Sequence, residues 1–348
     1  MYGKYIYGII DSSNEIDFNI SGLNGPSPVY SIAHEDLSCV VSNYLGQEFS
    51  SISKEEVVRC LLAHQVVVEH VMREHAVLPV KFGTVLTTSD EVRSLLSQGY
   101  SQFVDALAWI QDKVEIEVAA TWDKKQILQE IRAEPEIFCA AKAIASRPEQ
   151  QTLQGQIQLG QMVKASIDKR RQSYWERMIN FLMSVAIDVQ HNALVSDEMV
   201  MNVAFLVDKS CQEEFDSCVK QLDDLFCNQI NFRIIGPLPP YTFATVEVSR
   251  PSPEKIEEAR QLLHLGKTFS GLEIRKAYRH LAAESHPDYR AGDELELAKV
   301  QFGKLHQASE LLSAYCQGHG QIDANLLINI RRLRNEEVQH LSFAEIGV

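Results

Sequence analysis

The segment "HQVVVEHVMREH", residues 64–75, is the part of the sequence that comes closest to a metal-dependent active site. His70, Glu74 and His75 have nearly the HxxEH spacing of a metal hydrolase, with one extra residue. On a helix, His70 and His75 point about 140° apart, and His64 and His75 are separated by about 16 Å along the axis. Because neither pair can share a metal ion, we interpret these histidines as residues of helix faces, and a metal hydrolase is the less favoured alternative.

The rest of the sequence offers no other pattern of catalytic, cofactor-binding or metal-binding residues. It contains no GxGxxG or GxxxxGK[ST] phosphate loop and no GxSxG turn. The segment from Gly236 to Pro240 is rich in proline, which lacks the N–H groups that bind phosphate. The seven cysteines include no CxxC pair, so we expect reduced thiols and no zinc site. We therefore predict no catalytic residue, no metal and no cofactor.

Composition and charge narrow the class of protein. With 45% hydrophobic and 23% charged residues, the chain has the composition of a folded globular protein. Its net charge of −14 argues against binding to nucleic acid or to an anionic membrane, since both require a positive protein surface. The apolar run before Asp11 is too short for a signal peptide, and no run approaches the roughly 20 residues of a membrane-spanning helix. We expect a soluble, cytoplasmic protein without nucleic-acid or lipid partners.

The periodicity of apolar residues predicts a mixed α and β fold for most of the chain. Capping sequences at Ser53–Glu56 and Thr88–Glu91 start two helices, and residues 124–191 have an almost wholly helical pattern. A further helix is predicted at 211–227. Strands are predicted at 4–10, 38–45, 76–86, 114–122, 199–207, 230–236 and 241–248. The predicted fold class is α+β, with two ferredoxin-like units joined by a helical segment, followed by an all-α helical hairpin.

Four segments are predicted along the chain. They are an N-terminal ferredoxin-like domain over 1–122, a helical segment with a second ferredoxin-like unit over 123–249, a helical domain over 252–316, and a helical tail over 317–348. The linker "SRPSPEK" separates the second from the third, since serine and proline typically start a new helix. The helical domain has nine Lys/Arg and ten Asp/Glu, so almost the whole net charge lies outside it.

Four segments in order resemble the GvpL/GvpF family of gas vesicle proteins. They are "YIYGII", "LPVKFGTVL", "VAFLVDK" and "GPLPPYTFATVEV", and the resemblance covers residues 1 to about 248. This chain has Leu238 where the family usually has tryptophan. We interpret the motif residues mainly as determinants of the fold, with a stiff proline turn that returns the chain as a hairpin. These residues are Pro79, Lys81, Phe82, Gly83, Gly236, Pro237, Pro239, Pro240, Tyr241 and Phe243.

The resemblance implies an accessory protein of gas vesicle formation rather than an enzyme. Such proteins assist nucleation or assembly of the vesicle wall and contact its small hydrophobic shell subunit and other accessory proteins. A strongly apolar subunit needs partners before it polymerises, because exposed apolar patches aggregate. We therefore expect a cytoplasmic protein that associates with the gas vesicle.

The helical domain carries the tripeptide His286-Pro287-Asp288. A capping box at Ser270–Glu273 starts the helix before it, on which Ile274, Tyr278 and Leu281 form an apolar stripe. Proline ends that helix, and a third helix over about 297–315 packs back against it. Together with "AYRHLA" eight residues earlier, this hairpin resembles a J-domain.

The J-domain resemblance implies docking to Hsp70 and stimulation of its ATPase. The docking residues would be His286, Pro287 and Asp288, supported by the basic face of Arg275, Lys276 and Arg279. Two departures matter: Glu284-Ser285 replaces the usual Lys-Tyr, and the basic residues after the tripeptide are reduced to Arg290. Glu284 should weaken attraction to an acidic surface. A working J-domain and a domain kept for oligomerisation or shell binding both remain open, and a general Hsp70 co-chaperone with unrelated clients is the main alternative function.

Overall fold

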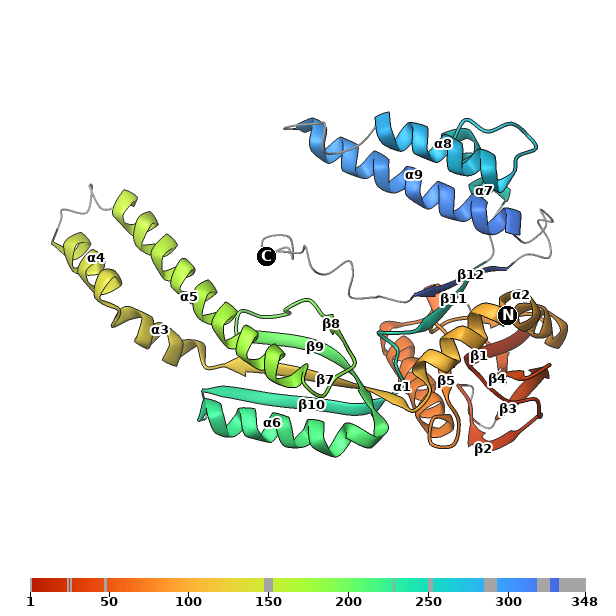
Figure 1. Ribbon diagram of the computed structural model, residues 1–348, viewed down its shortest axis with the longest axis horizontal. Helices are drawn as coiled ribbons and strands as arrows, with labels where there is room; N and C mark the ends of the chain where they lie inside the picture. Colours follow the sequence, from red (N-terminus) through yellow and green to blue (C-terminus); the bar gives the residue numbers. More distant parts are fainter. Residues whose placement is uncertain are drawn as a thin grey trace. The chain divides into compact units, whose positions relative to one another are not determined.

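The strands of this sequence form separate sheets in two units of the chain. In the computed structural model (Figure 1), the first unit comprises Met1–Trp109 and Thr245–Arg331, and the second comprises Ile110–Ala244. The structure describes residues 2–23, 25, 27–46, 49–146, 153–227, 229–249, 253–284, 293–317 and 326–331. The predicted α+β class, with a helical domain late in the chain, is confirmed.

The sheet of the first unit is built around β1 (Tyr2–Ile10). It pairs antiparallel with β4 (Leu37–Leu45) on one side and with β5 (Val77–Pro79) and β6 (Val85–Leu86) on the other. With β2 (Asp17–Ser21) and β3 (Pro28–His34), the strand order is β2-β3-β4-β1-β5. This is not the ferredoxin-like order expected for residues 1–122, because four strands follow one another before the first helix.

Two helices complete the first unit. Helix α1 (Lys54–Val71) begins at the predicted capping box, where Ser53 Oγ accepts the Glu56 N–H and the Glu56 carboxylate accepts the Ser53 N–H, both at 3.2 Å. Helix α1 ends at Val71, so His75 lies beyond it. Helix α2 (Ser89–Ile110) begins where Thr88 Oγ1 accepts the Glu91 N–H.

The second unit has a ferredoxin-like fold. Its four antiparallel strands are β7 (Lys113–Trp122), β8 (Asp188–His191), β9 (Met199–Asp208) and β10 (Ile230–Leu238), in the order β10-β7-β9-β8. Helices α3 (Lys124–Arg132), α4 (Pro135–Ala145) and α5 (Leu153–Leu182) lie between β7 and β8 in sequence. Helix α6 (Gln212–Phe226) connects β9 to β10. This β-α-β-β-α-β sequence of elements is typical of the ferredoxin-like fold.

One predicted boundary and one predicted helical assignment are corrected by this unit. The predicted boundary between residues 122 and 123 falls at the end of β7, which is a central strand of the second sheet and pairs with both β9 and β10. The unit therefore begins at Ile110. Strand β8 lies inside the segment predicted as helical, because its four residues are too few to show a strand pattern.

The two strands around the proline motif do not form the predicted hairpin. Strand β10 pairs with β7 in the second unit, whereas β11 (Thr245–Ser249) pairs antiparallel with β12 (Leu327–Arg331) in the first. Strand β12 also corrects part of the tail predicted as helical over 317–348, of which the structure describes only residues 317 and 326–331. Its register places Ser249 opposite Leu327, so main-chain pairing with β11 decides the conformation there.

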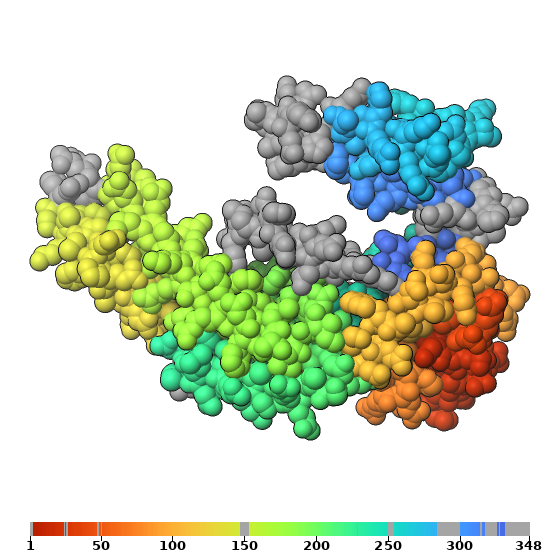
Figure 2. Space-filling view, viewed as in Figure 1, coloured from red at the N-terminus to blue at the C-terminus, as the bar shows by residue number. Residues whose placement is uncertain are grey.

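The predicted helical hairpin is present, and it lies between β11 and β12 in sequence. Helices α7 (Pro253–Leu262), α8 (Gly271–Glu284) and α9 (Asp293–Gln317) form what we call the J-like unit, residues 253–317. The three helices pack into one continuous body in the space-filling view (Figure 2). In the part of the chain that the structure describes, no helix combines the length and the apolar character needed to cross a membrane.

Candidate functional site

Two segments with family motifs, far apart in sequence, meet in the first unit. Val80 forms a parallel bridge with Val246, and the Lys81 N–H donates a hydrogen bond of 2.9 Å to the Val246 carbonyl. The exposed Lys81 Nζ lies 3.1 Å from the Glu247 carboxylate. The first motif is therefore held against β11 by main-chain and side-chain bonds, which supports the structural interpretation of Lys81.

An aromatic cluster lies next to this motif, beneath α1. Phe82 packs edge-on against the rings of Tyr5 and His64. The Tyr5 hydroxyl accepts the Gly83 N–H at 3.2 Å and lies 2.9 Å from His64 Nδ1. Burial lowers the pKa of His64 to about 4, so this histidine is neutral at pH 7. The motif thus holds α1 through a buried histidine on its inner face.

The outer face of α1 exposes four large apolar side chains. These side chains are between 46% and 57% exposed and belong to Val58, Leu61, Leu62 and Val66. Their spacing of three and four residues places them on one face, which we call the α1 stripe. The inner face, with His64, Val67, Val68 and Val71, packs on the sheet. Apolar faces of this kind mark interaction sites when they occur together on one element.

Sequence reasoning missed the α1 stripe although a signal was present. Residues 57–68 contain more apolar side chains than a single buried face can hold. The histidine pattern drew attention to metal binding instead. In the structure His64 is used in the core, His75 packs edge-on against the Phe18 ring, and no group of three or more potential metal ligands occurs among the described residues.

The first part of the second motif, from Gly236 to Thr242, lies against β7 in the second unit. Gly236 has φ +147°, and a Cβ there would lie 2.9 Å from the Glu115 carbonyl oxygen, so only glycine fits without strain. The buried Glu115 carboxylate accepts hydrogen bonds from the Thr242 N–H at 2.8 Å and the Thr242 hydroxyl at 2.6 Å. Phe243 is fully buried, while Tyr241 is half-buried.

Glu115 is a second residue that sequence reasoning missed. Burial raises its pKa to about 7 even though both bonds from Thr242 favour the charged form. Within the strand "KVEIEVAATW" it looks like one of two solvent-facing glutamates. Nothing local reveals its partner, because Thr242 comes 127 residues later.

We expect Glu115→Gln to change how the stability of the second unit depends on pH. Between the ordinary pKa of 4.5 and about 7, the folded state binds more protons at Glu115 than the unfolded state. Wild-type stability therefore falls as pH rises through this range, by about 3 kcal/mol. The glutamine does not titrate and keeps an acceptor for the Thr242 N–H.

Urea unfolding at pH 4.5, 6 and 8 measures this difference. The stability of Glu115→Gln relative to wild type should rise by about 3 kcal/mol across the series. The exposed Glu198→Gln serves as the matched control and should follow the wild-type profile. Identical profiles for wild type and Glu115→Gln would contradict a titrating carboxyl at this position.

The J-like unit has the packing that its sequence predicts. Ile274, Leu305, Ala308 and Leu312 are buried together with residues of α7, and the partly buried Tyr278 and Leu281 pack against this core. Tyr278 is half-buried, and its ring lies 6.0 Å from the His306 ring. The core therefore depends on Ile274 more than on Tyr278.

The candidate Hsp70-binding residues divide into two groups. Arg275, Lys276 and Arg279 are all exposed on α8, and their role in docking stays a prediction. His286, Pro287 and Asp288 lie outside the described residues. Helix α8 ends at Glu284, two residues before the tripeptide.

Comparison with known proteins shows that the J-like unit is similar to a known family of domains. Residues 260–316 match the sequence model of the family described as "DnaJ domain". The chain is 45% identical over 53 residues to the chaperone protein DnaJ of Francisella tularensis subsp. tularensis, which is 15% of this chain and 14% of that protein. The predicted J-domain resemblance is confirmed.

The remainder of the chain is similar to gas vesicle proteins. Residues 3–245 match the model described as "Gas vesicle synthesis protein GvpL/GvpF". The chain is 27% identical over 242 residues to gas vesicle protein F of Streptomyces sp. (strain CB03234), covering 69% of this chain and 98% of that protein. The crystal structure of GvpF from Anabaena sp. PCC7120 has the same fold, with a TM-score of 0.62 and 21% identity over 70% of this chain and 98% of that one. The chain therefore belongs to the GvpL/GvpF family of gas vesicle synthesis proteins and carries a DnaJ domain after the family segment.

Proposed function

We propose that this protein is a non-enzymatic assembly factor that binds the hydrophobic shell subunit of the gas vesicle before it polymerises. The α1 stripe is the observation that carries this proposal. It exposes four neighbouring apolar side chains on a helix whose inner face is fixed by the family motif. An apolar partner would bury this face, and burial of each leucine contributes about 1.5–3 kcal/mol. The protein would act in the cytoplasm, where it would associate with the forming vesicle.

The double variant Leu61→Ser/Leu62→Ser tests this proposal. Co-expression with the shell subunit should recover at least about tenfold less of that subunit than wild type, because tenfold corresponds to only about 1.4 kcal/mol. Stability should change by less than about 1 kcal/mol, since both side chains are exposed. Thermal unfolding of the purified protein checks the second expectation.

Leu225→Ser is the matched control for this experiment. Leu225 lies on α6 and is 54% exposed, close to the 57% of Leu62. It should leave recovery of the shell subunit unchanged. Equal recovery with the α1 double variant and with wild type would overturn the assignment of the stripe as the shell-binding face.

A second candidate function, recruitment of Hsp70, is favoured by the formed basic face of α8. Arg275, Lys276 and Arg279 are exposed on this helix, which ends two residues before the tripeptide. In this proposal the J-like unit brings Hsp70 to the shell subunit held by the rest of the chain. A general co-chaperone with other clients would use the same face.

We expect His286→Gln to abolish stimulation of Hsp70 ATPase by the full chain. The residue follows the end of α8 and precedes a proline, so its replacement should leave the helical core intact. Glu284→Lys should increase stimulation by removing a negative charge that repels an acidic partner surface. ATPase rates with the organism's own Hsp70 proteins measure both effects. Absence of stimulation by wild type and by Glu284→Lys would assign the unit another role.

A further inference from the structure

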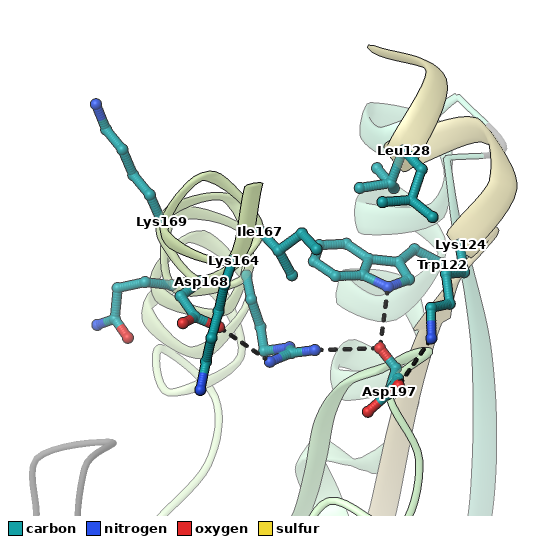
Figure 3. Close-up of a pocket in the computed structure, with 11 residues that line it drawn as sticks. Trp122, Lys124, Leu128, Lys164, Ile167, Asp168, Lys169 and Asp197 are labelled. Carbon is teal, nitrogen blue, oxygen red and sulfur yellow. Dashed lines mark hydrogen bonds and ion pairs between the residues drawn. The ribbon is translucent and has the colours of Figure 1, made fainter. Parts of the chain in front are cut away.

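A hollow in the second unit is not explained by either proposed function. It has a volume of about 810 Å³ and lies where the end of β7, the start of α3 and the middle of α5 come together. Its floor is apolar, with the buried side chains of Trp122 and Ile127 and the half-buried Ile167. Figure 3 shows the Ile167 side chain directed toward the Trp122 ring.

One wall of the hollow is formed by Arg171, whose guanidinium lies over the Trp122 ring. The Arg171 guanidinium lies 5.4 Å from the Trp122 ring and donates a hydrogen bond of 3.1 Å to the Asp197 carbonyl. The Trp122 indole N–H donates to the same carbonyl at 3.3 Å (Figure 3). The buried Arg171 Nε, however, has no hydrogen-bond partner among the described residues. A buried unpaired donor is unfavourable, so an acceptor from outside this set is expected.

The rim of the hollow is positively charged. Four basic side chains line it, against two acidic ones, in a chain whose net charge is −14. Asp197 is already paired with Lys124 at 2.7 Å, and Asp168 lies 3.6 Å from Arg171. Lys164 and Lys169 are exposed, and neither forms an ion pair or hydrogen bond within the part of the chain that the structure describes. The hollow thus has an excess of positive charge at its edge.

An apolar floor with an exposed charged rim is the arrangement of a protein interface. A small-molecule site instead needs several polar groups that converge inside the cavity. Here the only unpaired buried donor is Arg171 Nε, again counting described residues alone, and the exposed Lys169 side chain points away from Trp122 (Figure 3). These features favour a polypeptide segment with acidic and apolar side chains over a small anion.

We propose that this hollow binds the chain's own acidic segment, residues 335–348. The segment "NEEVQHLSFAEIGV" has three glutamates and no lysine or arginine, with apolar side chains at Val338, Leu341, Phe343 and Ile346. Its glutamates match the lysines of the rim, and its apolar residues match the floor. Residues 332–348 follow β12 and span up to about 58 Å when extended, since each residue adds about 3.4 Å.

Zero-length cross-linking of the full chain tests this assignment. A carbodiimide activates a glutamate carboxyl, and a lysine amine in contact then forms an amide while the carbodiimide leaves as a urea. We expect Glu336, Glu337 or Glu345 to link to Lys164 or Lys169 at least about tenfold more than to the exposed Lys142 or Lys220 of the same unit. Mixing ¹⁴N- and ¹⁵N-labelled protein shows whether both ends belong to one chain.

Hydrogen exchange gives a second readout that needs no lysine chemistry. Amides of residues 335–348 should exchange at least about fivefold faster in Lys164→Glu/Lys169→Glu than in wild type, because the reversed charges repel the glutamates. Lys142→Glu is the matched control and should exchange like wild type. Cross-links spread evenly over all four lysines would overturn the proposal. So would equal exchange rates of residues 335–348 in wild type and in Lys164→Glu/Lys169→Glu. Cross-links between ¹⁴N-labelled and ¹⁵N-labelled protein would show that the segment binds a second copy, and would overturn the assignment to the same chain.

Discussion

Acidification from pH 6.5 to 4 is expected to remove about 3 kcal/mol from the stability of the first unit through His64 alone. The side chain is 3% exposed, and burial lowers its pKa from 6.5 to about 4. Between these values the unfolded state binds more protons at this residue, so stability is fully present above pH 6.5 and is lost as pH falls. Between these two pKa values the free energy of unfolding falls by about 1.36 kcal/mol for each pH unit of acidification.

The variant His64→Phe isolates this contribution. Phenylalanine can keep the ring contacts with Phe82 and Tyr7 but does not titrate. Hydrogen exchange of β1 and α1 peptides, measured between pH 4.5 and 6.5, follows the first unit separately. The difference between wild type and variant also cancels the opposite contribution of Glu115, whose pKa is raised. If wild type and His64→Phe lose protection at the same rate on acidification, His64 does not titrate in this window.

Much of the fold follows from signals that are local in sequence. The capping box of Ser53 and Glu56 sets the start of α1 through bonds that span three residues, and the stripe of α8 contains Ile274 at the helical period. Likewise the strands around β9 and β10 have long apolar runs that permit few alternatives. Such elements were predicted because each is stabilised largely by its own residues and their spacing.

Features that depend on distant partners were not predictable in this way. Glu115 is buried because Thr242 binds it, and β12 is a strand because β11 pairs with it across the whole J-like unit. The position of β7 in the second sheet likewise depends on β9 and β10. The motif residues themselves were found by resemblance, whereas their contact with α1 depends on the packing of Phe82 against His64, 18 residues earlier in the chain.

The largest single-residue effect is expected for Ile274→Ala in the J-like unit. Ile274 is fully buried in its core, and truncation of a buried isoleucine to alanine typically costs about 2–5 kcal/mol. At about 0.05–0.15 kcal/mol per residue, a unit of this size has a total stability of roughly 3–10 kcal/mol. The substitution should therefore remove a large part of the stability of the J-like unit, and any stimulation of Hsp70 should fall with it.

Hydrogen exchange of α8 and α9 peptides in the full chain separates loss of fold from loss of docking. Ile274→Ala should remove protection from both helices while the strands of the two sheets keep theirs. Leu272→Ser is the control, since Leu272 is 63% exposed on the same helix. Tyr278→Phe should also be mild, because the ring is half-buried and its hydroxyl lies 3.4 Å from His306 Nδ1 in an exposed contact. Retention of full protection in Ile274→Ala would show that the core is held by other residues. His286→Gln should instead keep protection while stimulation disappears, and this contrast assigns each side chain to packing or to Hsp70 docking.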